Sequence, residues 1–74
     1  MAQAQALKDA GNKEFLAGNH QKAVELFTQA IELDPQNHIL FSNRSGAYAG
    51  LKDFQKAFED ANQTVTLKPD WPKV

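Results

Sequence analysis

The feature that most constrains this 74-residue sequence is an internal repeat with a period of 34 residues. Shifting the chain against itself by that distance gives seven identical pairs, which are Gln21/Gln55, Lys22/Lys56, Ala23/Ala57, Glu25/Glu59, Gln29/Gln63, Leu33/Leu67 and Pro35/Pro69. A regular period of this length indicates a stack of small supersecondary units. One such unit cannot cover its own apolar face, so it has to pack against a neighbour. The sequence therefore predicts a solenoid built by stacking.

Each repeat contains two segments in which apolar and small residues recur every three or four positions, as on one face of an α-helix. We expect helices at about 2–17, 20–33, 37–50 and 53–67, with each end uncertain by a few residues. Gly18 is suited to the end of a helix, and Pro35 cannot continue one. Asn37 and Asp53 can each cap the start of the helix that follows.

The small residues indicate how the helices pack. Two antiparallel helices can approach closely where both carry small side chains, which we expect at Ala23, Ala30, Ala57 and Ala61. Phe27 and Phe54 are expected to fill the space between successive hairpins. The predicted fold class is all-α.

Composition excludes several kinds of protein. The chain has no cysteine, which rules out disulfides and thiolate metal sites. A net charge of −1 argues against a partner that is nucleic acid or an anionic membrane. The longest apolar run is three residues, too short to span a bilayer, and the N-terminus lacks the features of a secretory signal. We therefore expect a cytoplasmic protein.

Catalytic and metal-binding patterns do not stand out. No nucleophile is paired with a base, and the acidic residues are interpreted as solvating charge on the outer helix faces. His20 and His38 each lack a second ligand at helical spacing. We expect neither an enzyme nor a cofactor.

The period, the paired helices, the alanines Ala23 and Ala57, and the motif Leu-x-Pro at 33–35 and 67–69 resemble the tetratricopeptide repeat. The resemblance covers essentially the whole chain. It implies one truncated domain over residues 1–74, with a first repeat at about 4–37, a second at about 38–71 and a stub of a third at 72–74.

A narrower resemblance is carried by three segments. They are Leu-Lys-Asp-Ala-Gly-Asn-Lys (7–13), Asn-His-Ile-Leu-Phe-Ser-Asn-Arg-Ser-Gly-Ala-Tyr (37–48) and Leu-Lys-Pro-Asp-Trp-Pro-Lys (67–73). These segments are similar to the N-terminal repeat domain of the heat-shock-organising, stress-inducible co-chaperones. That family implies an adaptor for the C-terminus of a cytosolic chaperone ending Glu-Glu-Val-Asp, with the 70-kilodalton class favoured over the 90-kilodalton class.

In that family a clamp of five residues holds the terminal carboxylates of the peptide. The resemblance places four of its members on Lys8, Asn12, Asn43 and Lys73. The fifth, an arginine one turn later, would lie beyond Val74. Gly46 departs from the family pattern, which usually has alanine at this position. Glycine inside a helix costs about 1 kcal/mol relative to alanine, and here it would widen the groove by one methyl group.

The proposed clamp makes physical sense. Lys8 and Asn12 are four residues apart and so project from one face of a helix, while Asn43 falls in the corresponding helix of the next repeat. An ammonium group and two amides are good donors to a carboxylate. Phe15 and Ala49 would supply apolar contact for the valine of the peptide. We expect Arg44 to pair with a neighbouring helix or carboxylate instead.

A second interpretation stays open. Two repeats with no following helix would leave an apolar edge at Phe54, Phe58 and Val65, which self-association could cover. The chain would then be chiefly a self-assembling scaffold with little ligand binding of its own.

Overall fold

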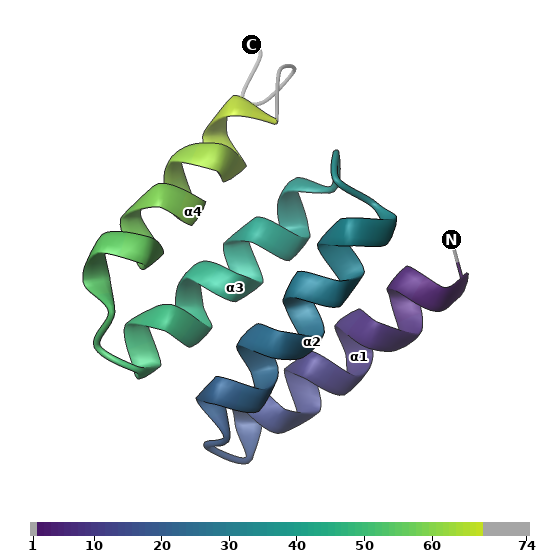
Figure 1. Cartoon of the computed structure of the whole chain (residues 1–74), viewed down its shortest axis with the longest axis horizontal. Coiled ribbons are helices and arrows are strands. Elements are labelled where there is room, and N and C mark those ends of the chain that lie inside the picture. Colours follow the sequence, from purple (N-terminus) through teal and green to yellow (C-terminus); the bar gives the residue numbers. More distant parts are fainter. Residues whose placement is uncertain (1, 68–74) are drawn as a thin grey trace, which may run out of the picture.

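Four α-helices account for nearly all of residues 2–67, the part of the chain that this computed structural model describes. They are α1 (Ala2–Leu16), α2 (His20–Leu33), α3 (His38–Gly50) and α4 (Phe54–Thr66). Figure 1 shows them side by side in chain order, running alternately up and down. Each helix packs on the next, and α1 also contacts α3. The prediction of an all-α fold is confirmed, and the expected helix ends differ from the observed ones by one residue at most.

The loops end the helices as the sequence indicates. Asn37 caps α3 by accepting a hydrogen bond of 3.0 Å from the backbone N–H of Ile39. Asp53 caps α4 by accepting one of 3.4 Å from the backbone N–H of Lys56. Gly18 has a φ of 87°, in the left-handed region that glycine adopts without a steric penalty.

Small residues allow the first three helices to close around Phe27, whose side chain is fully buried. The core cluster consists of Phe27 together with Ala23, Val24 and Ala47. A Cβ atom at Gly11 would lie only 2.5 Å from Cε1 of Phe27, so α1 needs glycine there to approach α2. Phe15 packs against the same cluster while remaining half-exposed.

Two packing expectations are wrong. Phe54 is 65% exposed and does not fill a space between hairpins. Ala61 is exposed as well, so it is not a point of close helix approach. Both lie on the side of α4 away from α3, and no other helix among residues 2–67 packs against that side. Ala23, Ala30 and Ala57 are buried as expected.

An ion pair joins α4 to the rest of the molecule. Asp60 is only 6% exposed, which corrects the expectation that all acidic residues are solvated. Its two carboxylate oxygens accept from Nε of Arg44 at 2.7 Å and from Nη2 at 2.9 Å. Arg44 also donates to the hydroxyl of Thr28 at 3.1 Å, so the network links α2, α3 and α4. The expected structural pairing of Arg44 is confirmed.

The surroundings hold Arg44 in its charged form. The hydrogen bond to Asp60 raises the pKa of the guanidinium, against the opposing effect of partial burial. Its central carbon also lies 5.5 Å and 5.7 Å from the ring centres of Phe41 and Tyr48, within range of a cation–π attraction.

None of the helices described here is long and apolar enough to cross a membrane.

The buried pair yields a prediction about stability. We expect Asp60→Asn to lower the free energy of unfolding by about 3 kcal/mol, because it leaves the guanidinium of Arg44 partly buried without a counter-charge. Chemical denaturation measures the change. The double variant Arg44→Met/Asp60→Leu should lose less than the single variant, since it leaves no unpaired charge. Equal stability of Asp60→Asn and the wild type would contradict the role given to the pair.

The loop between α3 and α4 yields a second prediction. Lys52 has a φ of 63° and occupies the position in the second repeat that Gly18 occupies in the first. Both repeats therefore need a residue with the left-handed backbone conformation at this position. Since a side chain is strained in that conformation, we expect Lys52→Gly to raise the free energy of unfolding by roughly 0.5–1 kcal/mol. Thermal denaturation would test this. Gly18→Ala is the matched control and should destabilise the chain; a gain there would show that the left-handed turn is not required.

Candidate functional site

The candidate ligand-binding groove lies between α1 and α3. It has a volume of about 220 Å³ and a mainly apolar lining. Its lining residues are Asn12 and Phe15 from α1, and Ser42, Asn43 and Gly46 from α3. Asn12 and Phe15 are about one helical turn apart on α1, and on α3 Ser42 and Asn43 each lie about one turn before Gly46, so these side chains can line one groove. The groove therefore depends on how these two helices pack.

The two asparagines of the groove have no hydrogen-bond partner for their side chains within the described residues. Among the hydrogen bonds of residues 2–67, none involves the side-chain amide of Asn12 or Asn43, and both residues are half-buried. The asparagines at helix ends differ, because Asn19 donates to Glu14 at 2.8 Å and Asn37 donates to Asp34 at 3.1 Å. No side-chain nitrogen or oxygen of the described residues is both buried and unpaired, so these two amides still reach solvent and can donate to a ligand that accepts hydrogen bonds.

Packing behind the groove holds its aromatic wall. The ring of Phe15 meets the ring of His20 edge to face, with centres 5.2 Å apart and planes at 76°. His20 in turn lies directly on Gly50, where an added Cβ would collide with the imidazole. Because Phe15 also contacts the core cluster, its ring is supported from two sides. The wall is therefore fixed by the fold before any ligand arrives.

The structure brings together three of the six side chains that the sequence nominated. Asn12, Phe15 and Asn43 line the same groove. Lys8 is half-buried on α1, one turn before Asn12, and stands outside the lining. Ala49 is exposed on α3, about one turn beyond Gly46, and also stands outside it. Lys73 lies outside the described residues.

Ser42 lines the groove and was missed by the sequence analysis. The repeat itself carries the signal that could have found it. Shifting Lys8 and Asn12 by 34 residues leads to Ser42 and Gly46, so both residues are the second-repeat equivalents of nominated clamp positions, although only Asn12 of the first repeat lines the groove with them. Ser42 and Gly46 are small and leave space beside Asn12 and Phe15.

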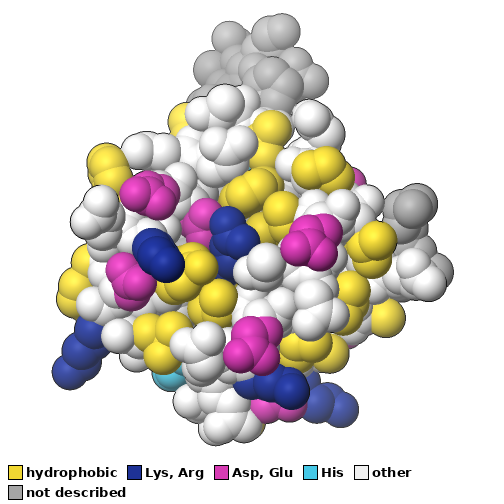
Figure 2. Space-filling view, in the orientation of Figure 1, with side chains coloured by type: hydrophobic (Ala, Val, Ile, Leu, Met, Phe, Trp, Pro, Cys, Tyr) yellow, Lys and Arg dark blue, Asp and Glu magenta, His cyan; other side chains and the backbone are white. Residues whose placement is uncertain are grey.

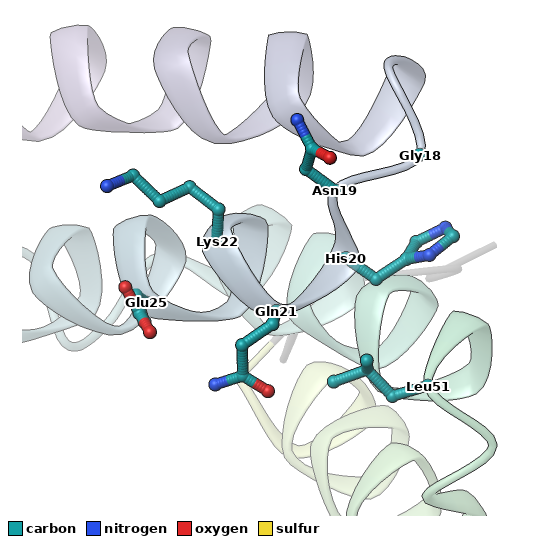
Figure 3. A pocket seen from close by; sticks show the side chains of 7 residues that line it. All are labelled: Gly18, Asn19, His20, Gln21, Lys22, Glu25 and Leu51. Carbon is teal, nitrogen blue, oxygen red and sulfur yellow. The ribbon is translucent and has the colours of Figure 1, made fainter.

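A wider hollow, of about 490 Å³, lies at the loop between α1 and α2. It is lined by Gly18, Asn19, His20, Gln21, Lys22, Glu25 and Leu51. Figure 3 shows the side chains of His20, Gln21 and Lys22 pointing in different directions across an open surface. Polar groups that diverge cannot hold one ligand together, so the smaller groove is the better candidate.

Charge and metal-ligand chemistry offer no rival site in the described part of the chain. On the face shown in Figure 2, basic and acidic side chains are interspersed with hydrophobic ones. No three His, Asp or Glu residues of the described ranges gather as ligands for a metal ion. The features that remain for recognition are the two amides and the apolar hollow beside them.

Comparisons with known proteins agree with this architecture. The family model described as tetratricopeptide repeat matches residues 4–37. The Hsp70-Hsp90 organising protein of Plasmodium falciparum is 49% identical over 71 residues, which cover 96% of this chain and 28% of that protein. Heat shock protein STI1 of Saccharomyces cerevisiae is 49% identical over 67 residues, which cover 89% of this chain and 11% of that protein.

Solved structures give the same result. The first TPR of Spaghetti (RPAP3), bound to the HSP90 peptide SRMEEVD, has a TM-score of 0.89 and 37% identity, covering 95% of this chain and 56% of that one. The Sgt2 TPR domain from Aspergillus fumigatus has a TM-score of 0.91 and 34% identity, covering 96% and 47%. The chain thus spans only part of the length of these relatives. It is a tetratricopeptide-repeat domain that resembles the TPR domain of the Hsp70-Hsp90 organising proteins and those of Sgt2 and RPAP3.

Proposed function

We propose that this domain is a co-chaperone adaptor that binds the acidic C-terminal peptide of a cytosolic heat-shock chaperone. The observation that carries the proposal is the pair of amides, Asn12 and Asn43, which line an apolar groove between α1 and α3 and make no side-chain hydrogen bond within residues 2–67. Amide N–H groups donate well to a carboxylate without adding charge. An apolar hollow beside them suits a peptide whose terminal carboxylate is preceded by an aliphatic side chain.

Two lysines add to the proposed clamp, and one alanine adds apolar contact beside it. Lys8, on the same face of α1 as Asn12, would supply the positive charge that the bound carboxylates need. Lys73 would add a second ammonium group, and Ala49 would extend the apolar contact along α3. The similarity to RPAP3 supports the ligand class, because that domain was solved with a peptide ending Glu-Glu-Val-Asp.

The proposal extends to the class of chaperone that is bound and to the cellular compartment. We propose that the 70-kilodalton chaperone class is preferred over the 90-kilodalton class, on the similarity of residues 7–13 and 37–48 to the N-terminal repeat domain of the co-chaperones. The adaptor would act in the cytoplasm, without catalysis, cofactor, nucleic acid or membrane. Titrating C-terminal peptides of both chaperone classes against the domain would test the preference.

The clamp predicts that binding depends on a free carboxylate. We expect SRMEEVD to bind and its C-terminally amidated form to bind at least about tenfold more weakly, because hydrogen bonds to a charged group contribute roughly 1.5–3 kcal/mol. Asn43→Ala should weaken binding of the free acid by a similar factor. Isothermal titration calorimetry measures both effects, and added salt should weaken binding further.

Asn62→Ala is the matched control for that experiment, because Asn62 is exposed on α4 and lies outside the groove. It should leave the affinity unchanged. Equal binding of the free acid and the amide would contradict a carboxylate clamp. Equal losses for Asn43→Ala and Asn62→Ala would show that the groove is not the binding site.

Self-association is the second candidate function, and a specific surface favours it. The side chains of Phe54, Phe58 and Val65, which we call the α4 apolar face, are each about two-thirds exposed. Exposed aromatic groups that share one helix face are a frequent feature of protein contact sites. A second copy of the chain could cover them.

This candidate predicts an oligomer that depends on the α4 apolar face. If it holds, sedimentation should show an average mass that rises with concentration, and Phe58→Ser should shift the equilibrium toward monomer. Leu16→Ser is the matched control, because Leu16 is also exposed but belongs to α1. A monomer at every concentration, or an equal effect of both variants, would exclude self-association through this face.

A further inference from the structure

Three glycines lie within the helices, and at the two interior positions, Gly11 and Gly46, glycine costs the helix about 1 kcal/mol relative to alanine. They are Gly11 in α1, and Gly46 and Gly50 in α3. A helix interior retains glycine at this cost where a side chain would not fit or where the space has a use. The atoms around each glycine show whether a side chain would fit there.

Packing accounts for two of the three. A Cβ at Gly11 would lie 2.5 Å and 2.7 Å from Cε1 and Cδ1 of Phe27, which is fully buried and cannot move aside. A Cβ at Gly50 would collide with the imidazole ring of His20. At both positions alanine is excluded by a neighbouring ring.

Gly46 is different, because alanine would fit there. The nearest atoms to an added Cβ are Cε1 and Cζ of Phe15, each 3.8 Å away, which is ordinary van der Waals contact. The space that Gly46 leaves open belongs to the groove, since both Gly46 and Phe15 line it. Packing within residues 2–67 therefore does not require glycine at this position, and the space that a methyl group would fill is part of the groove.

We infer that Gly46 sets the size of the apolar side chain that the groove accepts, and that the groove takes one methylene group more than valine. This inference rests on the proposed function. The side chain concerned is that of the residue before the terminal aspartate, which reaches the hollow between Phe15 and Gly46 when Asn12 and Asn43 hold the carboxylate. Gly46 thus determines specificity without itself donating a hydrogen bond.

The experiment compares two peptides on three proteins. The peptides are SRMEEVD and SRMEEID, which differ by one methylene group at the penultimate residue. The proteins are the wild type, Gly46→Ala and Ala10→Gly. Ala10 is exposed on α1 and outside the groove, so its replacement changes helix propensity while leaving the lining intact.

The expected result is a change in the ratio of the two affinities. On the wild type, SRMEEID should bind about fourfold more tightly than SRMEEVD, the effect of burying one more methylene group. On Gly46→Ala that gain should disappear or reverse, while on Ala10→Gly it should persist. The melting temperature of Gly46→Ala should rise by up to about 4–8 °C, and that of Ala10→Gly should fall.

The outcomes separate this inference from the proposed function. An unchanged preference for SRMEEID in Gly46→Ala, or no preference in the wild type, overturns the inference while leaving peptide binding in place. A fall in the melting temperature of Gly46→Ala also overturns it, because glycine would then be needed for packing. Failure of both peptides to bind the wild type overturns the proposed function and the inference together.

Discussion

The burial of Phe27 against the backbone of Gly11 is the contact on which the rest of the structure depends. It sets the distance between α1 and α2, and the alanines around it let α3 join the same core. Phe15 rests on this cluster, so the aromatic wall of the groove is positioned by the core. The groove is therefore a shallow hollow on a thin layer of helices, and its aromatic wall is held in place by the core.

Polar groups divide between structure and recognition. The buried pair of Arg44 and Asp60 satisfies its own hydrogen bonds within the protein and ties α4 to α2 and α3. Asn12 and Asn43 have no such partners among residues 2–67. Neighbouring residues of one helix, Asn43 and Arg44, thus have opposite roles because they point to different faces of α3. The first is available to a ligand, and the second fixes the stack.

The repeat period and helical spacing were enough to predict four helices and both asparagine and aspartate caps, since these depend on local pattern. They were also enough to place Asn12 and Asn43 on facing helices. Exposure was harder to predict. Phe54 was expected both to fill a space between hairpins, which is wrong, and to lie on an apolar edge with no following helix, which its exposure confirms. Ala61 was expected at a helix contact and is exposed, because whether such a position is covered depends on neighbouring helices. Asp60 looked like a solvated charge because its partner lies 16 residues away on another helix.

The central claim is that the amides of Asn12 and Asn43 bind the carboxylate of an acidic peptide. It is tested most directly by following the side-chain amide signals of all asparagines by NMR while SRMEEVD is added. We predict that the signals of Asn12 and Asn43 shift together with a single affinity, while those of Asn19, Asn37 and Asn62 remain in place. Shifts confined to the α1–α2 loop or to α4, with Asn12 and Asn43 unmoved, would contradict the account.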